Sequence, residues 1–84
     1  MHRVAIYGHD LPGRAGTARL GRQVARLAGE VARRPDCVHV ATYADQGPGA
    51  PGLRPGLSRL LAEAPGRVDL VVVDDYRPAL DRPP

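Results

Sequence analysis

Arginine is the residue type in this sequence best suited to binding chemistry, because all twelve basic residues are arginine and lysine is absent. A guanidinium group pairs with phosphate oxygens in a bidentate fork, so clustered arginines can hold phosphate-bearing partners. Residues 1–34 carry seven arginines against Asp10 and Glu30, whereas residues 35–84 carry five against seven acidic residues. The basic character therefore belongs to the N-terminal third, where either a phosphate-binding surface or a solvated helix face would produce it.

A second route to phosphate binding is a glycine-containing loop between a strand and a helix, whose backbone N–H groups cradle the anion. Residues 8–15 stand in such a context. Arg14 occupies the place where a nucleotide-binding loop needs lysine, and Ala15 the place where it needs a magnesium-binding hydroxyl. His9 and Asp10 are adjacent, and adjacent side chains rarely point at one reacting atom. We interpret this segment as a connecting loop.

Nucleophiles and metal ligands are scarce. Cys37 is the only cysteine, so neither an internal disulfide nor a cysteine-based metal cluster is expected, and we interpret it as a small strand residue. Ser58 is the only serine and falls within a predicted helix. Thr17 is the remaining candidate for an unorthodox nucleophile. We predict no metal site and no cofactor.

Three apolar segments predict the strands of a mainly parallel sheet. They cover residues 3–7, 38–43 and 68–73, and the last is apolar enough to be covered on both faces. Helical patterns separate them, so the element order is βαβαβ. The right-handed crossover rule then predicts a three-layer α/β sandwich with residues 3–7 as the central strand.

Two amphipathic helices are predicted between these strands. The first covers residues 17–33, and a second begins at Pro55 and ends before Pro65-Gly66. The apolar faces expected to pack on the sheet are Leu20, Val24, Leu27 and Val31 in the first helix, and Leu57, Leu60 and Leu61 in the second. The outer stripe of the first helix is Arg19, Arg22, Arg26 and Arg33. Glycine and proline make residues 45–52 a loop.

The chain length of 84 residues predicts a single domain, with residues 78–84 as an irregular tail. No apolar run approaches the roughly 18 residues that cross a bilayer, and no basic start precedes a short apolar segment. We therefore expect a soluble, cytoplasmic protein without a membrane partner.

Five segments in this order resemble the N-terminal catalytic domain of serine site-specific recombinases, the resolvase/invertase family. They are VAIY at 4–7, LGRQ at 20–23, TYADQG at 42–47, RPGL at 54–57 with RLL at 59–61, and GRVDLVVV at 66–73. In that family a serine hydroxyl attacks a DNA phosphodiester while arginines neutralise the transition state. The resemblance covers nearly the whole chain, and it implies a resolvase-type fold and DNA as a partner.

The resemblance places the catalytic serine of the family at Leu11 and an arginine of the family at His9. Sliding the motif along the loop recovers Arg14 as the arginine but places Gly16 at the nucleophile. Ser58 falls where the family has no nucleophile. The family's reaction is therefore not expected here under either alignment.

Other positions of the family are retained. The resemblance assigns Asp45 and Arg54 to the aspartate after the second strand and the arginine at the second helix, both of which support the phosphate site. Arg77 and Arg82 approximate a pair of arginines after the third strand. We expect Asp45, Arg54 and at least one of Arg14, Arg77 and Arg82 to meet near the carboxyl ends of the strands.

Three functions remain open. The first is a non-catalytic recombinase-like domain that binds DNA weakly, either a regulator that pairs with a full-length recombinase or the product of a decayed mobile-element gene. The second is a phosphoryl-transfer enzyme that uses Thr17 or another unorthodox nucleophile, and the third is a generic α/β interaction or nucleotide-binding module. The family's subunit-pairing helix and its separate DNA-binding domain have no counterpart, so we do not expect the chain to carry out recombination alone. We favour the first function, with salt-sensitive binding and no cleavage.

Overall fold

The buried centre of the molecule is β1 (His2–Asp10), whose apolar residues pair with a parallel strand on each side. The computed structural model describes residues 1–47 and 54–74. Its other strands are β2 (Cys37–Gln46) and β3 (Leu70–Val73), and the order in the sheet is β2-β1-β3. This confirms the predicted α/β class, the βαβαβ order and the central first strand.

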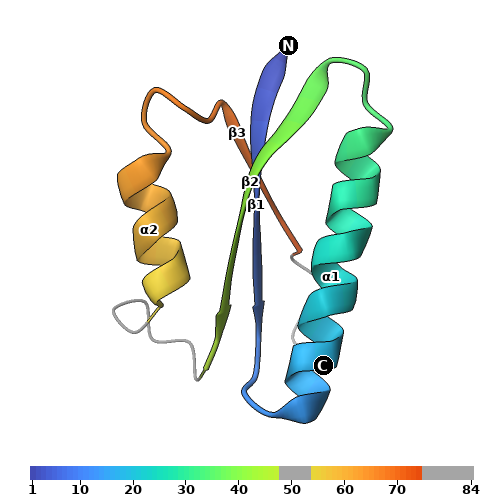
Figure 1. Ribbon diagram of the computed structural model, residues 1–84, viewed down its shortest axis with the longest axis vertical. Helices are drawn as coiled ribbons and strands as arrows, with labels where there is room; N and C mark the ends of the chain where they lie inside the picture. Colours follow the sequence, from blue (N-terminus) through green and yellow to red (C-terminus); the bar gives the residue numbers. More distant parts are fainter. Residues whose placement is uncertain (48–53, 75–84) are drawn as a thin grey trace, which may run out of the picture.

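Two helices cover opposite faces of the sheet, as Figure 1 shows with the sheet seen edge-on. α1 (Arg14–Ala32) packs Leu27 and Val31 on Val4 and Ile6. α2 (Pro55–Glu63) packs Leu60 on the alternate residues of β1. Successive strand side chains point to opposite faces, so one apolar strand fills both cores.

α1 begins three residues earlier than predicted, because Gly13 adopts a φ of 104° that turns the chain into the helix. The backbone N–H of Thr17 then donates to the Gly13 carbonyl. Further along the helix, Leu20 and Val24 are only half-buried, and they lie directly over Gly8. The residue at position 8 has little room, since a Cβ there would lie 2.7 Å from Leu20 Cδ1.

The prediction that Leu61 packs on the sheet is wrong. Its side chain is 67% exposed, whereas Leu60 is buried and Leu57 is half-buried. Consecutive residues in a helix point about 100° apart, and α2 contacts the sheet along a single narrow line. Only one of the two neighbouring leucines can face the core.

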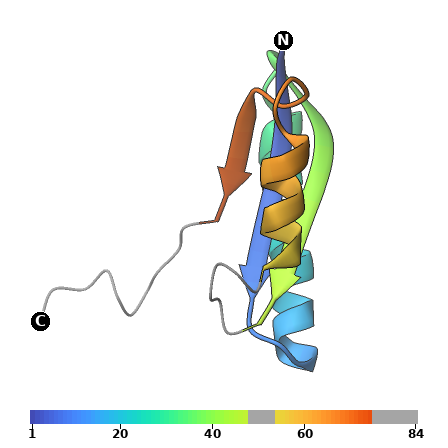
Figure 2. The ribbon, with the colours of Figure 1, turned by 90° about the vertical axis from the view of Figure 1, so that its left-hand side faces the viewer.

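The third strand is shorter and more exposed than predicted. β3 begins at Leu70, and Leu70, Val71 and Val73 are each about half exposed, so the prediction of cover on both faces is wrong. β3 is an edge strand, and the helices lie over β1 and β2, as Figure 2 shows. Val72 alone packs against the core under α1. β2 in turn continues to Gln46, so the prediction that Asp45 and Gln46 belong to a loop is wrong. Residues 48–52 of the predicted loop and the predicted tail lie outside the described residues.

One ion pair connects the start of β1 to the segment that enters β3. The Arg3 guanidinium lies 3.0 Å from Asp69 Oδ1, and the backbone N–H of Arg3 donates to Asp69 Oδ2 at 2.7 Å. The Asp69 N–H donates to the Arg3 carbonyl at 2.8 Å. Hydrogen bonds from the Arg3 side chain and backbone lower the pKa of Asp69 to about 2.

We predict that Asp69→Asn lowers the urea midpoint at pH 7, and that the difference from wild type disappears on acidification. The pKa of the folded carboxyl group lies below that of the unfolded one, so its contribution is complete above about pH 4 and is lost as the pH falls towards about 2. Urea unfolding followed by circular dichroism across this range measures the effect. Asp36→Asn, at an exposed position, is the control, and a difference that persists unchanged at pH 2 contradicts the prediction.

Candidate phosphate-binding site

Asp45, at the end of β2, holds the start of α2 against the sheet. The residue is 7% exposed, and its carboxylate accepts hydrogen bonds from the backbone N–H groups of Gly56 at 2.7 Å and Leu57 at 2.8 Å. The Tyr7 hydroxyl donates to the same carboxylate at 2.8 Å. N–H groups in the first turn of a helix have no partner within the helix, so Asp45 acts as a cap supplied by a neighbouring strand.

These contacts keep Asp45 ionised and Tyr7 protonated near neutral pH. Burial alone would raise the pKa of Asp45, but the hydrogen bonds from Gly56, Tyr7 and Leu57 outweigh it, and the pKa is lowered. Burial and the carboxylate of Asp45 raise the pKa of Tyr7 to about 12. An acid–base catalyst works best with a pKa near the operating pH. Asp45 and Tyr7 therefore position the helix rather than exchange protons near neutrality.

Arg54 lies at the same end of the sheet as Asp45. It is the residue before the first turn of α2, and it is half-buried. Burial and Asp45 raise the pKa of Tyr7, and the charge of the nearby Arg54 partly offsets them. The Arg54 Nε atom is buried without a hydrogen-bond partner. The resemblance assigns Asp45 and Arg54 to the same site, and the structure places both of them near the phenol group of Tyr7.

The loop after β1 carries no nucleophile at either predicted position. Leu11 is 58% exposed, and a different side chain would fit there. Gly16 is buried, and a Cβ at this position would lie 1.8 Å from the Leu11 carbonyl oxygen. Of the two positions that the resemblance allows for the serine, only position 11 has room for a side chain.

The Thr17 hydroxyl lies in the first turn of α1 without an activating base. It donates to the Gly13 carbonyl at 3.0 Å, and the Gln46 side-chain amide donates to it at 3.0 Å. Within residues 1–47 and 54–74, no carboxylate or imidazole forms a hydrogen bond with this hydroxyl. Alcohol nucleophiles are weak until a neighbouring base removes the proton. Among the described residues, no group is therefore placed to activate Thr17.

Of the three arginines predicted to complete the site, the structure describes only Arg14, and it is not joined to Asp45 or Arg54. Arg14 is exposed at the first residue of α1, and no hydrogen bond or ion pair links it to Asp45 or Arg54. Arg77 and Arg82 lie outside the described residues.

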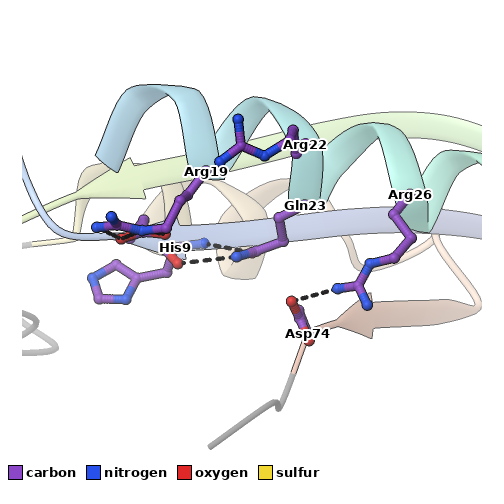
Figure 3. Close-up of a pocket in the computed structure, with 7 residues that line it drawn as sticks. His9, Arg19, Arg22, Gln23, Arg26 and Asp74 are labelled. Atoms are coloured by element: carbon purple, nitrogen blue, oxygen red, sulfur yellow. Dashed lines mark hydrogen bonds and ion pairs between the residues drawn. The ribbon is translucent and has the colours of Figure 1, made fainter. Parts of the chain in front are cut away.

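The structure contains a cavity that the sequence analysis did not predict. It has a volume of about 670 Å³ and lies beside α1 at the ends of β1 and β3 (Figure 3). Its lining residues are His9, Asp10, Arg19, Arg22, Gln23, Arg26 and Asp74. The i, i+3, i+7 spacing of the three arginines is the one sequence signal that could have indicated it, because this spacing places them on one helix face.

Two carboxylates already contact the arginines of this cavity. Arg19 Nη2 lies 2.9 Å from Asp10 Oδ1, and Arg26 forms an ion pair with Asp74. Hydrogen bonds from Arg19 and from the Leu11 backbone lower the pKa of Asp10. Arg22, between the two pairs, has no hydrogen bond or ion pair in the part of the chain that the structure describes.

The wall of the cavity formed by β1 is held by a side-chain amide. Gln23 accepts from the His9 backbone N–H at 3.0 Å and donates to the His9 carbonyl at 3.3 Å. The His9 side chain itself follows that of Tyr7 on the α2 face of the sheet, since Gly8 faces α1. The group of the cavity that suits an oxyanion is therefore the Arg22 guanidinium, which has no counterion among the described residues.

Other ligand classes find less support. Among the described residues, no group of three or more histidine, cysteine, aspartate or glutamate side chains could hold a metal ion. The same residues include no helix with the length and apolarity needed to cross a membrane.

Comparisons of the chain with protein-family models, with curated proteins and with solved structures find no match.

We predict that Asp45→Asn destabilises the fold by about 1–3 kcal/mol, because the amide nitrogen would replace one carboxylate oxygen and face a backbone N–H group that needs an acceptor. Urea unfolding at pH 7 measures the loss. Tyr7→Phe removes only one of three donors to the carboxylate and should cost about 1 kcal/mol. Wild-type stability in Asp45→Asn would show that the capping bonds contribute nothing.

Proposed function

We propose that this chain is a resolvase-like domain that associates with DNA through the arginine face of α1 and does not cleave it. The observation that carries the proposal is the row of three arginines, Arg19, Arg22 and Arg26, along one cavity at the carboxyl edge of the sheet. Open α/β sheets bind their ligands at this edge. Guanidinium groups there suit the phosphodiester backbone.

The resemblance to serine recombinases gains support from two positions. Asp45 and Arg54 lie at the same end of the sheet, close to Tyr7, as expected for a phosphate-supporting pair. The carboxylate holds the helix whose first residues follow Arg54. A resolvase-like arrangement would need this arginine to be fixed in place.

The absence of cleavage follows from the loop. Leu11 has no group to deprotonate, and Gly16 leaves no room for a side chain. In the described part of the chain, no base forms a hydrogen bond with the Thr17 hydroxyl. Loss of a single charge-stabilising donor alone costs roughly 10²–10³ in rate, and loss of the covalent route costs far more.

A protein-interaction module is the second candidate, and one observation favours it. Leu70, Val71 and Val73 present a half-exposed apolar edge strand, which is a template for pairing with another chain. A full-length recombinase is the partner that the resemblance suggests. This candidate predicts no DNA binding by the isolated chain.

We predict that DNA binding by the purified chain is weak, independent of sequence and sensitive to salt. Affinity for a labelled duplex, measured by fluorescence anisotropy, should fall more than tenfold between about 50 and 200 mM salt. Arg22→Ala should weaken binding to all sequences alike and reduce the salt slope by about 1. Arg67→Ala is the matched control, since this exposed arginine follows α2 at the opposite edge of the sheet. Equal losses in the two variants would contradict a site on α1.

We predict that the chain forms no covalent link to DNA. Purified protein is incubated with end-labelled supercoiled and linear DNA, then denatured and separated by electrophoresis. No protein-linked strand should appear, because the described residues place no activated nucleophile at the arginine cavity or beside Arg54. A covalent band that disappears in Thr17→Ala would support the enzyme alternative.

A further inference from the structure

The arginine cavity lies at the point where the chain changes direction across the sheet. From β1, the chain passes through α1 to β2 on one side, and from β2 it passes through α2 to β3 on the other side of β1. The crevice between the carboxyl ends of β1 and β3 is therefore the topological switch point, where open α/β sheets place ligands. His9 and Asp10 belong to the end of β1, and Asp74 follows β3, so the cavity opens at this crevice (Figure 3).

The arginines that line the crevice outnumber the carboxylates that line it. Arg19, Arg22 and Arg26 share one helix face, where like charges three or four residues apart repel each other. Asp10 pairs with the first and Asp74 with the last. The middle guanidinium has no counterion among the described residues, so the lining holds three arginines against two carboxylates.

The two ion pairs also show that an oxyanion fits this crevice. Each aspartate places its oxygens against a guanidinium, as the oxygens of a bound phosphate would. Arg22 and Arg26 are four residues apart, so their side chains are neighbours on α1 and can contact one anion. A ligand that displaces Asp74 from Arg26 could therefore contact both Arg22 and Arg26.

We propose that the switch-point crevice binds a phosphate monoester, the group found on a free nucleotide or at the end of a nucleic acid. A monoester carries nearly two negative charges and three terminal oxygens near neutrality, enough for Arg22 and Arg26 together. A backbone diester offers one charge and two free oxygens. The inference rests on the proposed function for the choice of a phosphorylated ligand, and the experiment separates the two.

The test measures binding of thymidine 5′-monophosphate, with thymidine as the matched ligand control, by isothermal titration calorimetry at fixed salt. The monophosphate should bind and thymidine should not. Arg22→Ala should weaken binding at least tenfold, whereas Arg67→Ala should leave it unchanged. Asp74→Asn should strengthen binding severalfold, because it releases Arg26, and this gain cannot arise from misfolding.

A second comparison identifies the source of the phosphate. Duplexes that differ only in a 5′-phosphate or a 5′-hydroxyl are compared: a preference for the phosphorylated end indicates nucleic-acid ends, and equal binding alongside monophosphate binding indicates a free nucleotide. Salt-sensitive duplex binding without monophosphate binding overturns the inference and leaves the proposed function intact. Monophosphate binding without duplex binding contradicts the proposed function and leaves the inference intact. Weaker binding in Asp74→Asn also overturns the inference.

Discussion

The hydrogen bonds to the Asp45 carboxylate are the interactions on which the rest of the structure depends. It belongs to β2, accepts a hydrogen bond from Tyr7 of β1, and accepts two more from the first turn of α2. One buried charge thereby joins both strands to the second helix in a chain whose cores contain only a few fully buried residues. Because small domains bury a limited fraction of their surface, a single polar cluster contributes a large share of the interactions that fix their elements in place.

The arginine face of α1 depends on the packing of that helix in turn. Leu27 and Val31 set its rotation about its axis, and this rotation directs Arg19, Arg22 and Arg26 towards the switch point between β1 and β3. Their mutual repulsion opposes helix formation, and the aspartates at the ends of β1 and β3 offset part of it. Charge and packing are thus coupled, since the same strands that bury the apolar face supply the counterions.

The sequence predicts those parts of the fold that follow from local periodicity. Apolar alternation and helical spacing locate all three strands and both helices, because burial imposes these periods directly. The exposure of β3 is not predictable in this way, since it depends on where the helices lie across the sheet. The cavity is not predictable from local periodicity either, because the ion pair between Arg26 and Asp74 in its lining joins residues that are 48 positions apart in the sequence. Asp45 was singled out through a resemblance, but its capping role requires Gly56 to lie against β2.

The cost of substitution differs between the positions that hold the fold and the positions that a reaction in the loop would need. Leu11 lies on an exposed loop, where a change of side chain alters stability by only a few tenths of a kcal/mol. Asp45 is buried and accepts three hydrogen bonds, so its replacement leaves several polar groups unsatisfied. The groups that hold the architecture and those that would perform a reaction are therefore separate here. Folding physics alone favours keeping Asp45, and with it the position of Arg54, whether or not a nucleophile stands in the loop.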